Sequence, residues 1–341
     1  MEPENAFRRF PAEWEKHEAT WIFWPTGSEA YLYGKPTDYP LVRDAFVQLI
    51  DRIAAFEPVR VVVSPKDMEE ARSLLGKRAD QLLTLEINDA WARDAAPTFL
   101  HTQSGLSALC WTFTGWGGRF RPYDKDAKVA PHLATHMGIP VLSTTFAMEG
   151  GGVHSNGEGT LLTTDPVLFD SGRNPQRKKE SLRTELQNIL GAQKALSLPA
   201  VFDGDDTGGH VDVIAAFHPE GMVLLNDCRD AGDPNKESTE QNERYLRGEK
   251  KEVVRIPQPE ATYSGQDRLA HSYLNFYICN HAVILPSFGS TLDQRVRDQF
   301  RELFPHHDIV CVEARPFYWG GGGIHCVTQQ QPERIRSSLR E

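Results

Sequence analysis

Five amphipathic helices, each followed by a short strand rich in β-branched residues, recur along this chain of 341 residues. Apolar side chains spaced by four, as at Val129, Leu133 and Met137, predict a helix, and short apolar runs predict strands. A helix cannot bury its apolar stripe alone, so such units must pack against one another in an array or a ring. The predicted helices span residues 40–55, 125–138, 177–191, 235–248 and 290–304, followed by VRVVVS, IPVLSTT, ALSLP, EVVRIP and DIVCVEA.

Further strand candidates lie ahead of these helices, at WIFWP, ALCWTF, TLLTT, MVLLN and AVILP, and a short extra helix is predicted near residues 67–76. Each unit therefore consists of a strand, a helix and a strand, with additions. One doubly wound α/β sheet is the alternative that the same pattern allows. Because no low-complexity linker interrupts the chain, residues 1–341 are predicted to form a single domain.

The charge of the chain disfavours two classes of partner. The formal net charge is −10 and is spread along the chain, which disfavours nucleic acid and anionic membrane surfaces. It favours a cationic substrate, although ordinary solubility accounts for the charge equally well. No apolar run reaches the ~18 residues that cross a bilayer. The N-terminal residues show no apolar signal segment, so the protein is expected in the cytoplasm.

One of the five cysteines differs from the rest in its sequence context. Cys326 follows a glycine run and His325, and glycine lets a backbone and a substrate approach closely. A thiolate is the best nucleophile among side chains, so Cys326 is a candidate catalytic residue. An odd number of cysteines without tight spacing indicates neither a disulfide framework nor a structural zinc site. The other four are predicted to pack as small apolar side chains: Cys110, Cys228, Cys279 and Cys311.

Polar residues gather in four glycine-rich or apolar segments: residues 88–97, 149–157 and 205–212, and the segment that holds His325 and Cys326. If His210 and Asp212 lie on an extended strand, they face the same side, one to transfer protons and the other to anchor a cation. A surface strand explains this pair as well. A salt bridge with Arg93 is the alternative for Asp94, and a turn carboxylate is the alternative for Glu149.

Several common kinds of site are not supported by the motifs. The glycine runs match neither GxGxxG nor GxxxxGK[ST], so a nucleotide cofactor is not expected. His154, His210, Asp212 and Cys326 are metal-ligand types, but no HExxH or Cys/His spacing supports a site. Hence neither a cofactor nor a metal is predicted. A papain-like protease carries its cysteine early in the chain, whereas Cys326 is late.

Five segments in order resemble the successive motifs of one enzyme family: NDAWARDAAPTF, EGGGVHSNGEGTLLTT, DDTGGHVDVIAAF, SYLNFYICN and GGGGIHCVTQQQP. The chain is similar, over essentially its whole length, to agmatine deiminases and the Porphyromonas-type peptidylarginine deiminases of the pentein superfamily. The resemblance implies an α/β fold in the form of a five-fold pseudosymmetric α/β propeller, in agreement with five units. It also implies a homodimer.

The resemblance implies a role for each matching residue. Cys326 is the nucleophile, His210 the general acid and base, and Glu149 the acidic residue close to that histidine. Asp94 and Asp212 hold the guanidinium group, because two carboxylates match its planar fork of N–H donors. Further residues are assigned to substrate binding: Trp91, beside the planar cation, and Asp206, Arg119 and Arg121.

The substrate implied by this resemblance is a small guanidinium cation. Agmatine, giving N-carbamoylputrescine and ammonia in polyamine synthesis, is the leading prediction. Arg119 and Arg121 are two residues apart, so on a strand they would lie on the same face. There they would bind a carboxylate and favour a C-terminal peptidyl-arginine or free arginine as substrate. Solvent-facing arginines near Asp124 and Asp126 are the alternative, and a non-catalytic guanidinium-binding protein is the third hypothesis.

The sequence departs from the agmatine deiminase pattern at four positions near these motifs. The nucleophile, the acid/base residue and both guanidinium carboxylates are retained, so deimination is still expected. The contacts with the end of the substrate that is remote from the guanidinium group are predicted to differ from those of agmatine deiminases. The four positions are Gly208, Val213, His271 and Gly323.

Overall fold

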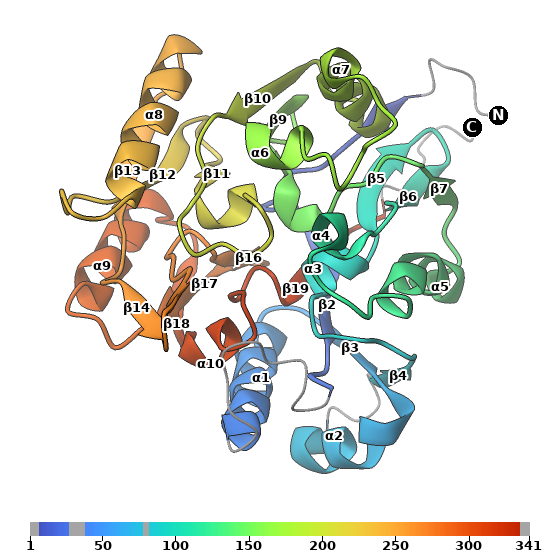
Figure 1. Cartoon of the computed structure of the whole chain (residues 1–341). Coiled ribbons are helices and arrows are strands. Elements are labelled where there is room, and N and C mark those ends of the chain that lie inside the picture. Colours follow the sequence, from blue (N-terminus) through green and yellow to red (C-terminus); the bar gives the residue numbers. More distant parts are fainter. Residues whose placement is uncertain (1–6, 27–37, 78–81, 335–341) are drawn as a thin grey trace.

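A computed structural model describes residues 7–26, 38–77 and 82–334 of the chain. Within these residues, five mixed sheets of three or four strands and one separate hairpin are present. The predicted repeat is confirmed: each of the five amphipathic helices precedes a strand that pairs in parallel with the strand before the helix. In Figure 1 these five helices lie at the outside of the molecule, and the shorter segments lie toward its middle. They are α1 (Tyr39–Ala54), α5 (Val129–Met137), α7 (Lys179–Leu190), α8 (Asn235–Gly248) and α9 (Asp293–Leu303).

Each sheet is built on the same plan. A central strand pairs in parallel with the strand that follows the helix, and antiparallel with another strand on its other edge. The central strands are β2 (His17–Phe23), β6 (Gly105–Cys110), β9 (Thr160–Thr164), β12 (Val223–Asp227) and β17 (Ala282–Ser287). Their parallel partners are β3 (Val59–Val63), β7 (Val141–Ser143), β10 (Lys194–Leu198), β13 (Val253–Pro257) and β18 (Asp308–Glu313). Their antiparallel partners are β19 (Thr328–Pro332), β5 (Thr98–Thr102), β8 (His154–Ser155), β11 (Ala215–Phe217) and β16 (Tyr277–Cys279).

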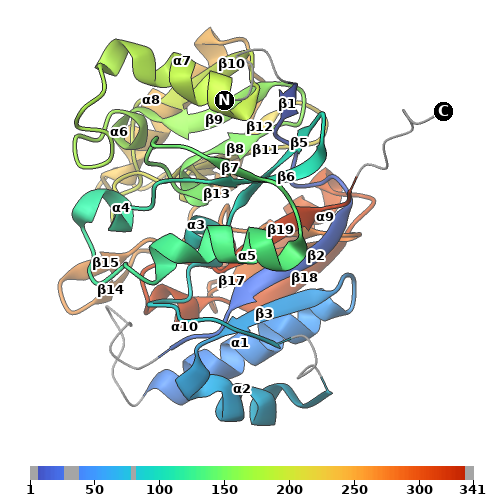
Figure 2. The ribbon, with the colours of Figure 1, turned by 90° about the vertical axis from the view of Figure 1, so that its right-hand side faces the viewer.

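The remaining elements extend this plan. The predicted extra helix is α2 (Met68–Leu75), which leads to β4 (Leu82–Thr84) beside β3. Strand β1 (Arg8–Arg9) pairs with β5 and also contacts α7 (Figure 2). The others are the hairpin of β14 (Thr262–Ser264) and β15 (Asp267–Leu269), and the short helices α3 (Ala92–Ala95), α4 (Gly115–Gly118), α6 (Asp165–Leu168) and α10 (Arg315–Tyr318).

The two ends of the described chain meet in one sheet. Strand β19 pairs antiparallel with β2, so that Gln329 lies opposite Trp21. The largest apolar cluster accordingly mixes residues from α1, β3, β17 and α9 with Ile324 and Val327 near the C-terminus. This pairing holds the segment of Cys326, which lies directly before β19, against the first part of the chain.

The five antiparallel strands matter most for function, because the turn ahead of each carries polar side chains. Helix α3 with Asp94 precedes β5, and the 3₁₀ turn η6 (Gly150–Gly152) precedes β8. The 3₁₀ turn η7 (Val211–Val213) precedes β11, Asn275 precedes β16, and Cys326 precedes β19. Each unit therefore contributes one polar turn. The turn η6 contacts both α3 and η7.

Candidate active site

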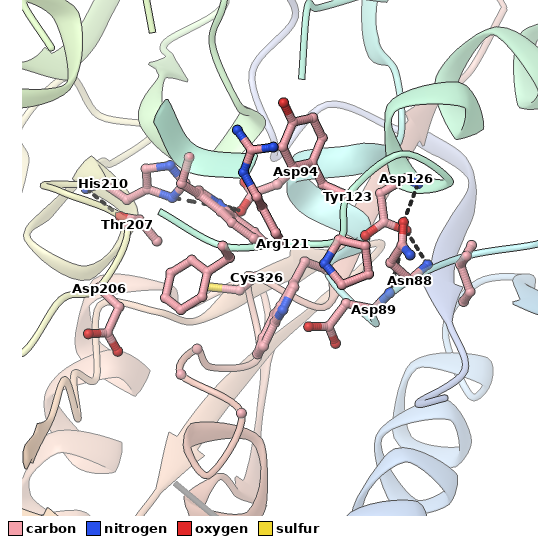
Figure 3. A pocket seen from close by; sticks show the side chains of 18 of the residues that line it. Asn88, Asp89, Asp94, Arg121, Tyr123, Asp126, Asp206, Thr207, His210 and Cys326 are labelled. Atoms are coloured by element: carbon pink, nitrogen blue, oxygen red, sulfur yellow. Dashed lines mark hydrogen bonds and ion pairs between the residues drawn. The ribbon is translucent and has the colours of Figure 1, made fainter. Parts of the chain in front are cut away.

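A cavity of about 520 Å³ lies where these turns meet. Most of the predicted site residues line it, although they are spread over more than two hundred positions of the chain. Figure 3 shows Cys326 in the middle of the cavity lining, with His210 and Asp206 on one side and Asp89 and Asp126 on the other. The predicted residues that line the cavity are Trp91, Asp94, Arg121, Asp206, His210, Asp212 and Cys326.

Gly151 is the point on which three of these side chains converge. A Cβ atom at this position would lie 2.5 Å from His210 Nδ1, 2.9 Å from Asp212 Oδ2 and 3.1 Å from Asp94 Oδ1. Its backbone N–H donates to Asp94 Oδ1 at 3.0 Å. Gly151 is thus needed for close approach, because any side chain at this position would push these three groups apart.

Asp94 accepts its hydrogen bonds from neutral donors. Trp116 Nε1 donates to Asp94 Oδ2 at 2.9 Å. The adjacent Arg93 turns away and pairs with Glu13 at 3.2 Å, so the alternative of an Arg93–Asp94 ion pair is wrong. Burial raises the pKa of Asp94, and the nearby Glu149 and Asp212 carboxylates raise it further, while His210 opposes the shift. A cation in the cavity would relieve this unfavourable concentration of negative charge.

His210 is surrounded by carboxylates. Its Nε2 lies 3.2 Å from Glu149 Oε2, and its Nδ1 lies 3.9 Å from Asp94 Oδ2. Burial alone would lower the pKa of His210, but Asp94, Glu149 and Asp212 outweigh it and raise the pKa to about 9. The ring is therefore an imidazolium at neutral pH. Its Nδ1 is buried without a hydrogen-bond partner in the described residues, so this N–H is available to a bound molecule.

Glu149 lies behind His210 and does not line the cavity. It is fully buried, and Arg173 Nε donates to Glu149 Oε2 at 2.8 Å. Burial would raise the pKa of Glu149, yet Arg173 and His210 lower it below its ordinary value. The interpretation of Glu149 as a simple turn carboxylate is wrong, because its partners are a buried arginine and the ring of His210.

Asp212 lines the cavity, and its two carboxylate oxygens differ in their contacts. Asp212 Oδ2 lies 2.8 Å from His325 Nδ1 and 3.6 Å from Cys326 Sγ. Asp212 Oδ1 is buried and has no hydrogen-bond partner among the described residues. Burial opposes ionisation, but the His325 hydrogen bond and charge lower the pKa of Asp212. An ionised acceptor with an unused oxygen is suited to a guanidinium N–H.

The backbone at His210 and Asp212 differs from the prediction. The sequence pattern suggested an extended strand, whereas Val211–Val213 form a 3₁₀ turn and the strand starts at Ala215. Both side chains still line the cavity. The turn forms because the Asp205 carboxylate accepts hydrogen bonds from the backbone of Gly209 and His210, at 2.7 and 2.9 Å, which curls the segment.

The surroundings of Cys326 favour the thiol form of its side chain. Its side chain is buried, and burial together with Asp212 and Asp94 raises the pKa of the thiol well above its ordinary value. The four other cysteines are free, and three of them are buried while Cys311 is half-buried, in line with the prediction that they pack as apolar side chains. A Cβ atom at Gly322 would lie 2.7 Å from the ring of Trp91 and 3.2 Å from Cys326 Sγ. The glycine run therefore leaves space between the indole and the sulfur.

Two further residues of the site were not assigned from the sequence. Asn275 Nδ2 donates to Cys326 Sγ at 3.3 Å, and this contact favours the thiolate. Trp116 lines the cavity and anchors Asp94. Asn275 lies in SYLNFY, a segment used for the family resemblance, so that motif was the available signal. Nothing in the pattern around Trp116 distinguished it from a core aromatic residue.

The two predicted substrate-binding arginines do not share a strand face. The chain forms the short helix α4 and then an irregular segment, so the predicted alternation is wrong. Arg119 is not among the cavity-lining residues: its Nη2 pairs with Asp170 at 2.7 Å, and its substrate-binding assignment is corrected accordingly. Arg121 does line the cavity and lies near the ring of Tyr123.

The departures at Gly208 and Gly323 have structural counterparts. A Cβ atom at Gly208 would lie 2.7 Å from the guanidinium carbon of Arg119, so Arg119 occupies the space that a side chain there would need. A Cβ atom at Gly323 would lie 2.4 Å from Asn275 Oδ1 and 2.5 Å from the Tyr318 hydroxyl. Gly323 is therefore required by packing, because Asn275 and Tyr318 are buried. At Gly208 the φ of +86° disfavours a side chain, and the end of the Arg119 side chain would have to move.

The other two departures lie differently. Val213 lines the cavity, where it adds apolar surface. His271 is buried, stacks on Phe288 with ring centroids 4.6 Å apart, and has a pKa lowered by burial to about 4. It is a neutral core side chain rather than a member of the cavity lining.

Comparison with known proteins identifies the family. The model of the Porphyromonas-type peptidyl-arginine deiminases matches residues 9–332. The chain belongs to this family. The match covers all five polar turns and agrees with the resemblance seen in the sequence. Members of the family are hydrolases that act on C–N bonds of linear amidines.

Individual relatives agree with the assignment over their whole lengths. A protein of Streptomyces coelicolor named "putative agmatine deiminase" is 39% identical over 337 residues, which cover 95% of this chain and 98% of that protein. The solved agmatine deiminase of Enterococcus faecalis is 31% identical and superposes with a TM-score of 0.88 over 96% of both chains. The "putative arginine deiminase" of Porphyromonas gingivalis is 30% identical, with a TM-score of 0.87 over 97% of this chain and 100% of that one.

The α/β fold of the family, with its separate mixed sheets, is thus present in this chain. Two further observations concern the residues that the structure describes. None of the helices among them combines the length and the apolar composition that a bilayer crossing requires. Within the same ranges, no three His, Cys, Asp or Glu side chains are grouped as a metal site would group them.

Proposed function

We propose that the protein hydrolyses the guanidinium group of agmatine to give N-carbamoylputrescine and ammonia, through a covalent thiouronium on Cys326. The observation that carries this proposal is the set of unused polar atoms in the cavity. Asp212 Oδ1 and His210 Nδ1 are buried without partners in the described residues, beside the Cys326 thiol and Asp94. A planar cation with several N–H donors would satisfy these carboxylates and lie against the sulfur.

Binding of the cation prepares the nucleophile. Asp94 and Asp212 take the guanidinium N–H groups, and this orients the central carbon toward Cys326 Sγ. Burial and the two carboxylates raise the pKa of the thiol. The positive charge of the substrate offsets the two carboxylates, so the thiol releases its proton to solvent as the substrate binds, and the thiolate forms beside the guanidinium carbon.

The first half of the reaction releases ammonia. The thiolate attacks the guanidinium carbon, and a C–S bond forms to give a tetrahedral adduct. His210, which enters the reaction as an imidazolium, transfers its proton to the departing nitrogen, the C–N bond breaks, and a thiouronium remains on Cys326. Asn275 donates a hydrogen bond to the sulfur and stabilises the thiolate during this step.

The second half uses the same histidine as a base. His210 is now neutral and takes a proton from water, which adds to the thiouronium carbon. The tetrahedral species collapses, the C–S bond breaks, and the ureido product leaves with the thiol regenerated. Glu149, 3.2 Å behind the ring, stabilises the imidazolium that forms again.

The far end of the cavity favours an amine over a carboxylate. Asp89 and Asp126 line the side opposite His210 in Figure 3, and the distal group of agmatine is an ammonium. Burial raises the pKa of Asp89 to about 7 and that of Asp126 to about 8, so an arriving cation would favour their ionised forms. Trp91 hydrogen-bonds Asp89 at one side and faces Gly322 at the other, and so borders the path between the thiol and the acids.

A second candidate is deimination of a C-terminal peptidyl-arginine or of free arginine. The observation in its favour is Arg121, which lines the same cavity and could accept a carboxylate. The assay that separates these substrates uses purified protein with agmatine, arginine and a peptide ending in arginine, and it measures the ureido product of each. Turnover of agmatine at the highest kcat/KM supports the proposal, whereas turnover of the peptide alone overturns it.

The covalent step has its own test. Mass spectrometry of a His210→Ala variant mixed with agmatine is expected to show the thiouronium on Cys326, because hydrolysis lacks its base. Full activity with an unmodified Cys326 would contradict this route. A Cys326→Ala variant tests the third hypothesis, since a protein that only binds guanidinium compounds would lose nothing by that change.

We also propose that the five sheets close into the five-fold pseudosymmetric α/β propeller that the resemblance implies. Five units of one plan, and the pairing of the last strand with a strand near the N-terminus, support closure. Low-resolution solution scattering would test it. The homodimer, the cytoplasmic location, the single domain and the absence of nucleic-acid and membrane partners stay predictions.

A further inference from the structure

His325, next to the nucleophile in sequence, lies between two carboxylates outside the cavity. Its Nδ1 lies 2.8 Å from Asp212 Oδ2, and its Nε2 lies 2.8 Å from Glu13 Oε2. The ring is buried and is absent from the cavity lining. The chemistry proposed above gives it no part, so its burial between two acids needs an explanation.

The geometry determines the protonation of this ring. Ionised carboxylates only accept hydrogen bonds, and a neutral imidazole can donate only one. With an acceptor at each nitrogen, His325 satisfies both only as an imidazolium. Glu13 is itself held in place, because Ile278 N donates to its Oε1 at 2.8 Å and Arg93 pairs with its Oε2.

We propose that His325 is a positioning residue for the deimination reaction: bound to Glu13, it grips Asp212 Oδ2 and keeps Asp212 ionised with Oδ1 directed to the guanidinium group. This inference rests on the proposed function, because it assigns Asp212 to the substrate. Asp212 makes its side-chain contacts through Oδ2, to His325 Nδ1 and to Cys326 Sγ, and its Oδ1 is left buried without a hydrogen-bond partner among the described residues. The fixed cation also compensates Asp212 before the substrate arrives, and this makes a buried acid beside a thiol tolerable.

The surrounding charges decide the direction of the effect. Without the cation at His325, burial and the neighbouring negative charges would raise the pKa of Asp212. Its protonated form cannot accept the guanidinium bond in the same way. The groups facing Asp212 are His325, His210, Arg93, Asp94 and Cys326, and those facing His325 are Asp212, Glu13, Arg93 and His154.

The test is the pH profile of a His325→Gln variant, which keeps a donor and an acceptor but carries no charge. We expect KM for agmatine to rise about tenfold or more at neutral pH. The acid limb of kcat/KM should move up by about one pH unit, with activity partly recovered at high pH. A Glu13→Gln variant should shift the limb in the same direction by less.

His154 offers a matched control in the same region. Its ring lies 6.4 Å from that of His325, it is also buried, and its pKa is lowered by burial to about 4, so it is neutral. His154→Gln should leave the acid limb where it is. An acid limb of His325→Gln that coincides with that of the wild type, or an equal shift in His154→Gln, overturns the proposal.

A second readout does not depend on turnover. Histidine-labelled protein should show the nitrogen chemical shifts of an imidazolium at His325 at pH 7.5, and these should change in Glu13→Gln. A neutral His325 at that pH contradicts the positioning role even if agmatine is the substrate. If agmatine is not turned over but the imidazolium is present, the substrate assignment fails while the arrangement of His325 stands.

Discussion

Two networks of alternating charge lead away from the cavity, and they end differently. The His210 network runs through Glu149, Arg173 and Asp170 to Arg119. The Asp212 network runs through His325 and Glu13 to Arg93. The Arg119 side chain is 37% exposed, whereas that of Arg93 is only 5% exposed.

The difference shows how each network supports its residue. An exposed terminal charge is solvated and screened, so little free energy depends on it. A buried terminal charge has no water to replace a lost partner, so its removal leaves an uncompensated ion. The network of His210, the proposed acid/base residue, thus reaches the surface, while Asp212, the proposed guanidinium-binding carboxylate, belongs to a network of buried charges.

The largest expected effect comes from breaking each network at the cavity. His210→Ala should lower kcat by about three orders of magnitude or more while KM changes little, because proton transfer is lost. Asp212→Asn should lower kcat/KM by a similar factor, mainly through KM, because a guanidinium contact is lost. Steady-state kinetics on agmatine with both variants measures the split. Equal changes in kcat and KM for the two variants would remove the distinction between the networks.

The outer ends should differ in stability. Arg93→Met is expected to lower the free energy of unfolding by about 3–5 kcal/mol, because Glu13 is left as a buried, poorly compensated charge. Arg119→Met should lower it by less than about 1 kcal/mol, because the pair with Asp170 is partly exposed. Urea denaturation of the matched variants gives both values. Similar losses of unfolding free energy in the two variants would mean that burial of the terminal arginine does not explain the difference between the networks.

A smaller effect than that of Arg93→Met concerns stability at alkaline pH. The pKa of His210 is raised to about 9 in the folded protein, so its contribution is fully present below its ordinary pKa, near 6.5. The contribution is lost as the pH rises through about 9. We expect the wild type to lose about 2 kcal/mol more than His210→Gln between pH 6 and pH 10, by urea denaturation at each pH. Parallel pH dependences would show that His210 is not charged in the fold.

The sequence predicted the repeat because helix and strand periodicity are local properties. The five helices and their following strands lie close to the predicted positions, as for residues 235–248 and α8. The glycine runs also had a local meaning, since close approach needs the absence of a Cβ atom. The extended interpretation of residues 210–212 failed because a side chain, Asp205, competes for the backbone hydrogen bonds.

The contacts between distant segments could not be predicted in the same way. The ion pair of Arg119 and Asp170 joins two loops, and the sequence pattern of neither loop predicts which residue the other loop contributes. Only its place in the SYLNFY motif pointed to Asn275 in the sequence. Its contact with Cys326 depends on how two units pack together. The lining of the cavity by Asp89 and Asp126 likewise follows from the meeting of separate segments.

By itself, the sequence determined the order of the five units, the family and the candidate reactive groups, because each depends on short stretches of the chain. Only the tertiary structure decided which of those groups share the cavity, which stand behind them, and which charges hold them. The physical reason is that pKa shifts, ion pairs and buried polar atoms without partners depend on which groups lie close together and how deeply they are buried. His325 shows the difference: in sequence it is the neighbour of Cys326, and in the fold it is the partner of Asp212 and Glu13.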